Sequence, residues 1–264
     1  MKVISREQLE QYRRDGLLTG VRILDNAPAD AFRRRFDTLE GQEGPEKCAI
    51  GLVNRHMEEP FIWELATHPR MLDAIERIIG PDILLLASQF FCKYGPDEVK
   101  FVAWHQDVTY WGLEPPEAMT AWYAVDDADE GNGCMRAIPG SHIDGIREHG
   151  ESDKGGNLLS INQELKVSKE EDARAVDMPL RAGEISLHEG ALIHGSLPNR
   201  STRRRSGLTL RYIRPSVKQV KLNSMGDRYQ AILVRGEDRE KNFGAIDPPF
   251  TRSTPLTAGG RATL

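Results

Sequence analysis

The 264-residue sequence has few cysteines, and Cys48, Cys92 and Cys134 are widely separated. Three scattered thiols are too few for a disulfide framework, and none belongs to a Cys-x-x-Cys pair of the kind that binds structural zinc. A chain without such crosslinks is typical of a reducing compartment, so we expect a cytoplasmic protein.

Long hydrophobic runs and an excess of positive charge are also missing. The longest apolar stretch, residues 83–87, is far shorter than the roughly 20 residues of a membrane-spanning helix. The N-terminal segment contains no apolar stretch typical of a secretory signal. The formal net charge is −5, which argues against a nucleic-acid partner. We therefore expect a soluble protein that binds neither membranes nor nucleic acids.

The first third of the chain predicts helices. Ser5 can cap a helix that ends at Gly16, and a second helix is expected over residues 29–39. A third follows Pro60, with apolar residues at near-helical spacing as far as Gly80. We expect these helices to pack on the outside of a sheet.

From residue 82 onward the pattern changes to short strands separated by Gly, Pro and Asp turns. The predicted strands are 83–94, 101–109, 119–125, 133–138, 176–180, 184–187 and 207–214. Such a series favours an antiparallel barrel or sandwich, and we expect one domain over residues 1–264. The polar stretch 143–175 is interpreted as an insertion that forms a lid beside the site. The tail beyond Pro215 either wraps the barrel or mediates contacts in a homodimer.

Two separated segments carry residues typical of a mononuclear iron site. His105 and Asp107 lie two apart in a segment rich in β-branched and aromatic residues, so on a strand they would face the same side. His194 follows them, after an apolar pair and just before a Gly/Pro turn. Two imidazoles and one carboxylate are the protein ligands of non-haem Fe(II) oxygenases, which leave coordination positions open. The sequence thus predicts His105, Asp107 and His194 as metal ligands and catalytic residues.

The spacing His-x-acid is not specific by itself, because it also occurs at His56, His142 and His149. We interpret His56 as part of a polar run with no strand around it, His149 as part of a solvated loop, and His142 as part of a turn. His188 competes for the metal. On its predicted strand, however, it is better explained as a packed polar residue or one that supports a ligand.

Arg205 follows His194 by 205 − 194 = 11 positions and ends the basic run that begins at Arg203. We interpret this run as a solvated hairpin tip with one inward-pointing member. A second strand begins after Arg205, so we expect His194 and Arg205 on adjacent strands within reach of one ligand. An arginine there can hold the far carboxylate of a keto acid through a bidentate pair. The combination indicates an enzyme that activates oxygen.

These motifs resemble the phytanoyl-CoA dioxygenase family of Fe(II)- and 2-oxoglutarate-dependent oxygenases. The resemblance covers roughly residues 5–214 and depends on segments spaced in the same order. They are Trp104-His105-Gln106-Asp107, residues 120–128, residues 132–142, His194-Gly195-Ser196 and Arg205. The resemblance implies a mainly β fold with flanking helices, a double-stranded β-helix (jelly-roll, cupin-like barrel) with the metal at one mouth. Fe(II) and 2-oxoglutarate would be the cofactor and cosubstrate.

By position in the family pattern, Arg205 and Ser196 would bind the distal carboxylate of 2-oxoglutarate. Gln89 and Trp122 fall on strands that usually flank the cosubstrate. Lys93 stands where relatives often keep a lysine, with a solvated strand-end charge as the alternative interpretation.

Three residues are predicted to contact the substrate: Trp111, Tyr110 and Arg136. For the two aromatic residues the alternative is core packing. For Arg136 it is an ion pair with an acid such as Asp127.

The intact Asp107 favours hydroxylation as the reaction, because halogenating relatives replace this ligand by a small residue. The family name suggests an acyl-CoA, but nothing in the sequence resembles a dedicated site for a CoA diphosphate. Resemblance to the bacterial-type members of the family implies a small metabolite, an amino acid or a natural-product intermediate as the substrate, with molecular oxygen. Two alternatives remain open. The same iron chemistry can end in desaturation, epimerisation or ring formation, or the chain can be a non-catalytic jelly-roll that binds a ligand. A zinc hydrolase is disfavoured, because no general base stands at a motif-defined spacing.

Overall fold

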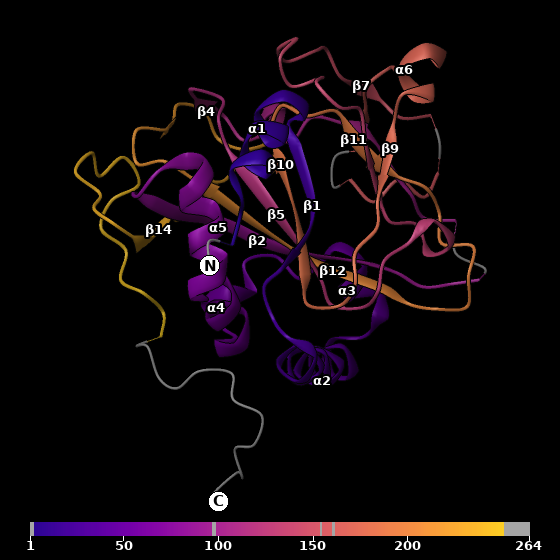
Figure 1. The fold of residues 1–264 in the computed structure, drawn as a ribbon, viewed down its shortest axis with the longest axis horizontal. Coiled ribbons are helices and arrows are strands. Elements are labelled where there is room, and N and C mark those ends of the chain that lie inside the picture. The colour runs from indigo at the N-terminus through magenta and orange to yellow at the C-terminus, as the bar shows by residue number, and fades with distance from the viewer. Residues whose placement is uncertain (1–2, 97–98, 154, 160–161, 251–264) are drawn as a thin grey trace, which may run out of the picture.

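Two antiparallel sheets face each other in the computed structural model, which describes residues 3–96, 99–153, 155–159 and 162–250 (Figure 1). The larger sheet has the strand order β1 (Leu17–Arg22), β10 (Glu184–Glu189), β5 (Met119–Ala124), β12 (Arg205–Ile213), β2 (Ile83–Lys93) and β14 (Ile232–Arg235). The smaller sheet has the order β3 (Val102–His105), β11 (His194–Ser196), β6 (Met135–Ala137) and β9 (Val176–Met178). The predicted fold class is confirmed: the chain forms a mainly β jelly-roll.

Alternation along the larger sheet separates a helical side from a pocket side. On β12, Leu208, Leu210 and Tyr212 pack into the main apolar core with residues of the N-terminal helices. Arg205 and Thr209 alternate with them and face a pocket between the sheets. The strand pattern therefore places apolar side chains under the helices and polar side chains toward the smaller sheet.

The N-terminal helices cover the outer face of the larger sheet, as predicted (Figure 1). The first is confirmed as α1 (Arg6–Asp15): the Ser5 side chain caps it, and Gly16, with φ of 74°, ends it in a left-handed conformation. The others are α2 (Asn26–Glu43), α3 (Pro45–Ile50), α4 (Pro60–Ala66) and α5 (Pro69–Ile79). The predicted third helix is thus two helices. The break comes at Pro69, which lacks an N–H and occupies the first turn of α5, where none is needed.

Three differences from the predicted strands affect the site or its surroundings. β3 ends at His105, and Asp107 begins a 3-10 helix, η2 (Asp107–Tyr110). β1 was not predicted, because its pattern is interrupted at Gly20. β14 comes from the tail and pairs with β2, so the tail extends the barrel; a homodimer stays a prediction.

The predicted insertion contains a small hairpin of β7 (Gly150–Glu151) and β8 (Gln163–Glu164), followed by α6 (Lys169–Ala173). Two further short strands, β4 (Leu113–Glu114) and β13 (Lys218–Gln219), pair with each other. Two 3-10 turns, η1 (Arg55–Met57) and η3 (Glu130–Asn132), complete the described elements. Leu159 of the insertion reaches the pocket between the sheets, and the lid stays a prediction.

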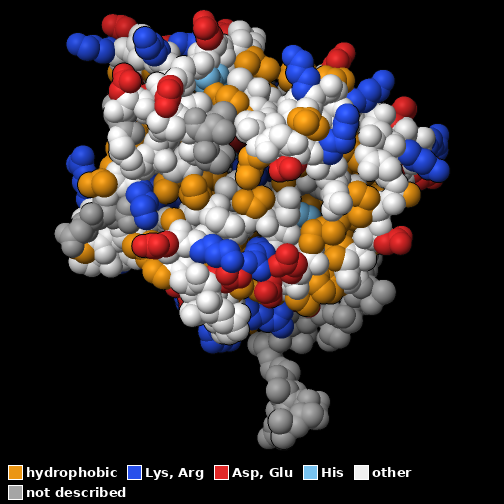
Figure 2. All heavy atoms as spheres, turned by 180° about the vertical axis from the view of Figure 1, so that it is seen from behind, with side chains coloured by type: hydrophobic (Ala, Val, Ile, Leu, Met, Phe, Trp, Pro, Cys, Tyr) orange, Lys and Arg blue, Asp and Glu red, His pale blue; other side chains and the backbone are white. Residues whose placement is uncertain are grey.

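The connection between β11 and β12 carries the basic run, and its arginines are not simply solvated. Arg204 is half-buried, pairs with Asp126 and Asp37, and lies over the Phe36 ring. On the face shown in Figure 2, Lys and Arg side chains are interspersed with Asp and Glu. Arg205 is buried, so the prediction of one inward-pointing member is confirmed. No described helix has the length and apolar character needed to cross a membrane.

Candidate metal centre

The two ligand histidines are brought together by strand pairing in the smaller sheet. β11 runs antiparallel to β3, and His194 is the register partner of His105. Asp107 follows His105 by two positions, and its Oδ1 atom lies 3.5 Å from His105 Nε2. One ligand atom from each of the three residues lies within 4.8 Å of the others, and all three side chains are buried. Asp107 therefore converges on the histidines from a 3-10 turn, whereas the prediction placed it on the strand.

Hydrogen bonds orient each ligand. The Nδ1 atoms of His105 and His194 lie 2.9 Å from the carbonyl oxygens of Ala103 and Leu192, respectively. A carbonyl oxygen only accepts, so each Nδ1 carries the hydrogen and each Nε2 keeps a lone pair for a metal. Both histidines are thus held in the tautomer that a metal ligand requires.

The third ligand, Asp107, is supported from the larger sheet. Thr120 Oγ1 on β5 donates to Asp107 Oδ2 at 2.9 Å, and His188 Nε2 on β10 lies 3.4 Å from the same oxygen. The second nitrogen of His188, Nδ1, is buried and has no hydrogen-bond partner in the described chain. His188 therefore supports a ligand, in line with the preferred interpretation of the sequence.

The electrostatics favour the protonation states that bind metal. Burial alone would raise the pKa of Asp107, but the neighbouring imidazoles of His105, His188 and His194 outweigh it and hold that pKa well below its usual range. Burial, with the neighbouring His105 and His188, keeps the pKa of His194 well below its usual range. Near neutral pH the site thus offers a carboxylate and a neutral imidazole, the forms that coordinate a divalent metal.

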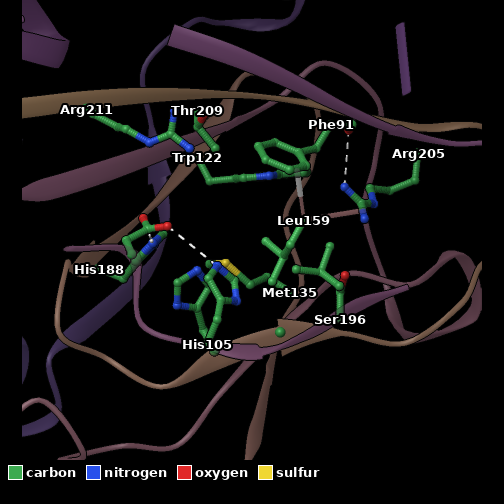
Figure 3. A pocket seen from close by; sticks show the side chains of 14 residues that line it. Phe91, His105, Trp122, Met135, Leu159, His188, Ser196, Arg205, Thr209 and Arg211 are labelled. Atoms are coloured by element: carbon green, nitrogen blue, oxygen red, sulfur yellow. Dashed lines mark hydrogen bonds and ion pairs between the residues drawn. The ribbon is translucent and has the colours of Figure 1, made fainter. Parts of the chain in front are cut away.

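The pocket beside the metal ligands has two ends, each with a buried arginine (Figure 3). At one end lie Arg205 and Ser196. The Arg205 guanidinium lies 5.4 Å from the centre of the Trp122 ring, and Trp122 packs on β12 where Gly207 leaves room: a Cβ atom there would lie 1.9 Å from the ring. Arg205 Nη1 donates to the Phe91 carbonyl at 3.3 Å, whereas Nε has no partner in the described structure. Burial lowers the pKa of Arg205 to about 10, so the group stays charged near neutral pH.

Lys93 is fully buried at the same end, so the interpretation as a solvated strand-end charge is wrong. Its Nζ donates to Ser196 Oγ at 2.6 Å and to the Leu197 carbonyl. The adjacent strand β12 covers β2 at this point, with Arg205 opposite Lys93 in the register. Ser196 is thereby held at the Arg205 end of the pocket.

At the other end, Arg211 lies between this inner pocket and an outer cavity of about 390 Å³. Trp111 and Tyr110 line the outer cavity and also pack in an apolar cluster with residues of β2. Trp111 and Tyr110 therefore pack in the core, as the alternative interpretation had it, and also line a cavity; their contact with a substrate stays a prediction. Gln89 lines the outer cavity, away from the Arg205 end, and donates to the Ile50 carbonyl at 2.9 Å.

Arg136 is placed away from both cavities. On β6, Met135 faces the inner pocket, so the next residue, Arg136, faces the opposite side. Its Nε atom lies 3.3 Å from Asp177 Oδ1, and a second ion pair joins it to Asp172. The ion-pair alternative therefore describes Arg136, with partners other than the expected Asp127.

Two of the other histidines are covered by tertiary packing. His56 lies in a polar run outside any strand, as predicted, and its side chain is buried, with Nδ1 2.7 Å from Ser88 Oγ. His149 was expected in a solvated loop, but Gln106 N donates to its Nε2 at 3.0 Å and its ring contacts Tyr110. The polar neighbours of His149 in the sequence did not indicate this packing.

Several pocket residues were not assigned from the sequence: Phe91, Leu159, Thr209 and Arg211. For two of them the sequence did contain a signal. Thr209 and Arg211 follow Arg205 at even spacing on one strand, so an inward-facing Arg205 implies that they face inward too. Leu159 had no such signal, because it stands in a loop.

Comparisons with known proteins agree with this geometry. The family model described as phytanoyl-CoA dioxygenase (PhyH) matches residues 12–207. The peroxisomal phytanoyl-CoA dioxygenase of Bos taurus is 24% identical over 222 residues, which span 75% of this chain and 65% of the bovine protein. A probable alpha-ketoglutarate-dependent hypophosphite dioxygenase of Stutzerimonas stutzeri is 26% identical over 228 residues, 86% of this chain and 77% of that protein.

Solved structures share the fold. The non-heme monooxygenase ThoJ, in its apo form, superposes with a TM-score of 0.72 and 29% identity, over 91% of this chain and 86% of ThoJ. CytC3 with Fe(II) and alpha-ketoglutarate superposes with a TM-score of 0.66 and 23% identity, over 91% of this chain and 92% of CytC3.

Proposed function

The chain belongs to the phytanoyl-CoA dioxygenase family of Fe(II)- and 2-oxoglutarate-dependent oxygenases, and from this premise we propose that it oxidises a small organic molecule with 2-oxoglutarate and molecular oxygen as cosubstrates. His105, Asp107 and His194 would hold the iron. Hydroxylation of an unactivated C–H bond is the proposed outcome. The substrate class is a small metabolite, an amino acid or a natural-product intermediate.

One observation carries the proposal. A buried His-Asp-His set, with Nδ1 of both histidines against carbonyl oxygens, shares its pocket with the buried Arg205 guanidinium, which has no acidic partner among the described residues. A buried charge without a counter-ion is costly, so such a group is expected where an anionic ligand completes the site. The distal carboxylate of 2-oxoglutarate fits this requirement, with Arg205 and Ser196 as its partners. Three ligands also leave open the coordination positions that a chelating keto acid and oxygen need.

When bound, Fe(II) would supply the oxygen activation that is coupled to conversion of 2-oxoglutarate into succinate and carbon dioxide. The chain's own residues do the positioning. Trp122 covers one wall, Leu159 and Phe91 exclude water, and the pair of Thr120 and His188 keeps Asp107 ionised and fixed in place. Substitution of either proposed iron ligand, His105 or His194, by alanine should abolish turnover.

The intact Asp107 supports hydroxylation over halogenation in this proposal. The same oxidising chemistry can also end in desaturation, epimerisation or ring formation, according to where the substrate lies. A cytoplasmic location is part of the proposal; all three cysteines are buried and free, which is compatible with a reducing compartment.

The test is an anaerobic titration of the metal-free protein with Fe(II) and 2-oxoglutarate, followed by visible spectroscopy. Chelation of Fe(II) by the keto acid gives a metal-to-ligand charge-transfer band, and we expect this band to saturate with one equivalent of each. Iron binding without the band would refute the 2-oxoglutarate assignment and favour the alternative of a non-catalytic binding protein. His194→Ala, which removes a ligand, is the matched negative control.

A further inference from the structure

Arg211 is a second buried guanidinium; its charge helps to lower the pKa of the nearby Asp107, but the proposed iron chemistry gives it no ligand. Its side chain lines both the inner pocket and the outer cavity and is 8% exposed. Its Nη2 atom makes one long hydrogen bond of 3.4 Å to Gln89 Oε1, and its Nε atom has no partner within the described chain. The Nε and Nη2 atoms share the edge of the guanidinium that can grip a carboxylate through two parallel bonds.

The position of Arg211 makes it separate from the cosubstrate end. Arg205 and Arg211 are six residues apart on β12, so their Cα atoms are about 20 Å apart. Each guanidinium lies against a different tryptophan: Arg205 against Trp122, and Arg211 at 5.0 Å from the Trp111 ring. In Figure 3 the two arginines stand on opposite sides of the pocket, with Trp122 and Phe91 between them and His105 below. A keto acid held at Arg205 and at the metal therefore leaves Arg211 for another ligand.

The outer cavity provides the body of such a ligand with apolar contacts. Its lining includes Trp111, Tyr110 and Tyr229, together with Leu158 and Leu159. Its volume of about 390 Å³ lies within the range of small-molecule sites.

The exposed part of the cavity lining is mixed in polarity. Val53 and Met225 are 40% and 63% exposed, and Ser224 is an exposed polar residue of the same lining. The cavity also has Asp227 and Arg228 on exposed wall positions, where water screens both charges. Arg211 is thus the buried cationic group that an entering molecule would meet next to the metal ligands.

We propose that the outer cavity binds the substrate as a small carboxylate with an apolar or aromatic body, and that Arg211 determines this specificity by pairing with the carboxylate. This inference deepens the proposed function and depends on it. Trp111 is the positioning residue: its ring supports the guanidinium through a cation–π contact. The paired carboxylate would hold the apolar body near the metal ligands, where one C–H bond can be oxidised.

The experiment compares acids with their primary amides, which have the same shape but no charge. Pentanoate, phenylpropanoate and indole-3-acetate, each with its amide, are titrated anaerobically into protein loaded with Fe(II) and 2-oxoglutarate, and quenching of tryptophan fluorescence reports binding. We expect at least one acid to bind roughly tenfold or more tightly than its amide. Arg211→Met should reduce the ratio of acid to amide affinity to about one, and Arg211→Lys should keep part of it. Arg235→Met, on β14 of the same sheet, is the matched control and should keep the full ratio.

The outcomes separate the two proposals. If the charge-transfer band does not form in the wild-type protein, the proposed function fails. If the band forms but no acid is preferred over its amide, including the case in which none of these molecules binds, the carboxylate proposal is overturned. A preference that persists in Arg211→Met would also overturn it. If Arg211 had a purely structural role, Arg211→Met would lower the stability of the protein and leave the ratio of acid to amide affinity unchanged. The preference for an acid over its amide is also measured in the wild-type protein, where no variant has to fold.

Discussion

At the scale of single residues, the carboxylate ligand depends on neighbours in the opposite sheet. Thr120 Oγ1 donates to Asp107 Oδ2 at 2.9 Å and is fully buried. Thr120→Val keeps the shape of the side chain and removes this hydrogen bond. Loss of such a contact to a metal ligand typically lowers metal affinity by about 10- to 100-fold. We expect a loss of that size for Fe(II), measured by anaerobic titration against a competing chelator.

A suitable control is Thr38→Val, because Thr38 is exposed on α2 and hydrogen-bonds only within its helix. Thr120→Val binding Fe(II) as tightly as Thr38→Val would show that the orientation of Asp107 does not depend on Thr120. Circular dichroism should show both variants folded, because neither substitution changes the volume of the core by much.

Replacing Arg205 by an apolar residue should weaken 2-oxoglutarate binding without lowering the stability of the metal-free protein. In Arg205→Met the paired charge for the cosubstrate is lost, and we expect 2-oxoglutarate to bind roughly 100-fold more weakly, equivalent to about 3 kcal/mol. The metal-free variant should be as stable as the wild type or more stable, because an apolar side chain replaces a buried charge without an acidic partner. The band titration measures the first effect and urea denaturation the second.

Arg203→Met is the control for both measurements, since Arg203 is exposed and pairs with Asp129 at the hairpin tip. Equal 2-oxoglutarate affinity in Arg205→Met and Arg203→Met would remove Arg205 from the site. A large loss of stability in Arg205→Met would instead assign it a role in folding.

At the scale of elements, the sequence predicted what depends on local pattern. On β10, Ile185 and Leu187 pack into the helical core while His188 faces the pocket, as the alternation of apolar residues indicated. The helix boundary at Gly16 followed from its left-handed conformation. These features are determined by neighbours a few positions away, so no knowledge of the fold was needed.

The relation between His194 and Arg205 depends on the fold and was predicted incorrectly. The hairpin was expected to place them on adjacent strands, but β11 belongs to the smaller sheet and β12 to the larger. The connection crosses from one sheet to the other, and the two side chains meet across the pocket. Hairpin statistics cannot show this, because strand length and spacing are the same for both arrangements.

The insertion gives the prediction at this scale. The inner pocket has only about 40 Å³ of free space, and Leu159 is the lining residue that comes from the insertion. Entry of 2-oxoglutarate should therefore move the segment around Leu159, and its amides should exchange hydrogen at a different rate once the ligand is bound. We expect hydrogen exchange in residues 156–159 and 162–165 to slow when Ni(II) and 2-oxoglutarate are added, as Leu159 closes over the occupied pocket.

α2 serves as the internal reference, because it packs on the far side of the larger sheet and should exchange at an unchanged rate. Equal exchange in residues 156–159 and 162–165 with and without ligand would mean that these residues do not act as a lid. Slower exchange in the whole chain would indicate general stabilisation by the ligand.

At the scale of the whole molecule, long-range packing decides which polar residues are buried. His56 shows this most clearly: its neighbours in sequence are polar, yet η1 packs against β2 and covers the imidazole to 1% exposure. Its Nδ1 atom meets Ser88, 32 positions away, and its Nε2 atom has no hydrogen-bond partner in the described residues. No local pattern could have distinguished this histidine from a solvated one.

The burial of His56 couples the stability of the protein to pH. Burial lowers the pKa of His56 to about 4 from a value near 6.5 in an unfolded chain. Well above pH 6.5 the imidazole is neutral in both the folded and the unfolded state, and the full stability is present. As the pH falls through 6.5 the unfolded chain gains a proton that the folded chain does not, and the loss of stability continues as the pH falls toward 4. Between pH 7.5 and 5 this group alone should lower the free energy of unfolding by about 2 kcal/mol.

Urea denaturation of the metal-free protein at several pH values, with a chelator present, measures this slope. The wild type also has other histidines with lowered pKa, such as His68 and His194, so the informative quantity is the difference from His56→Gln. The variant should lose the contribution of one proton and should therefore be less sensitive to pH by about 2 kcal/mol over the same interval, even if it is less stable at pH 7 through loss of the contact with Ser88. Parallel curves for the two proteins would mean that His56 titrates normally in the folded state, and that η1 opens to solvent more readily than its packing implies.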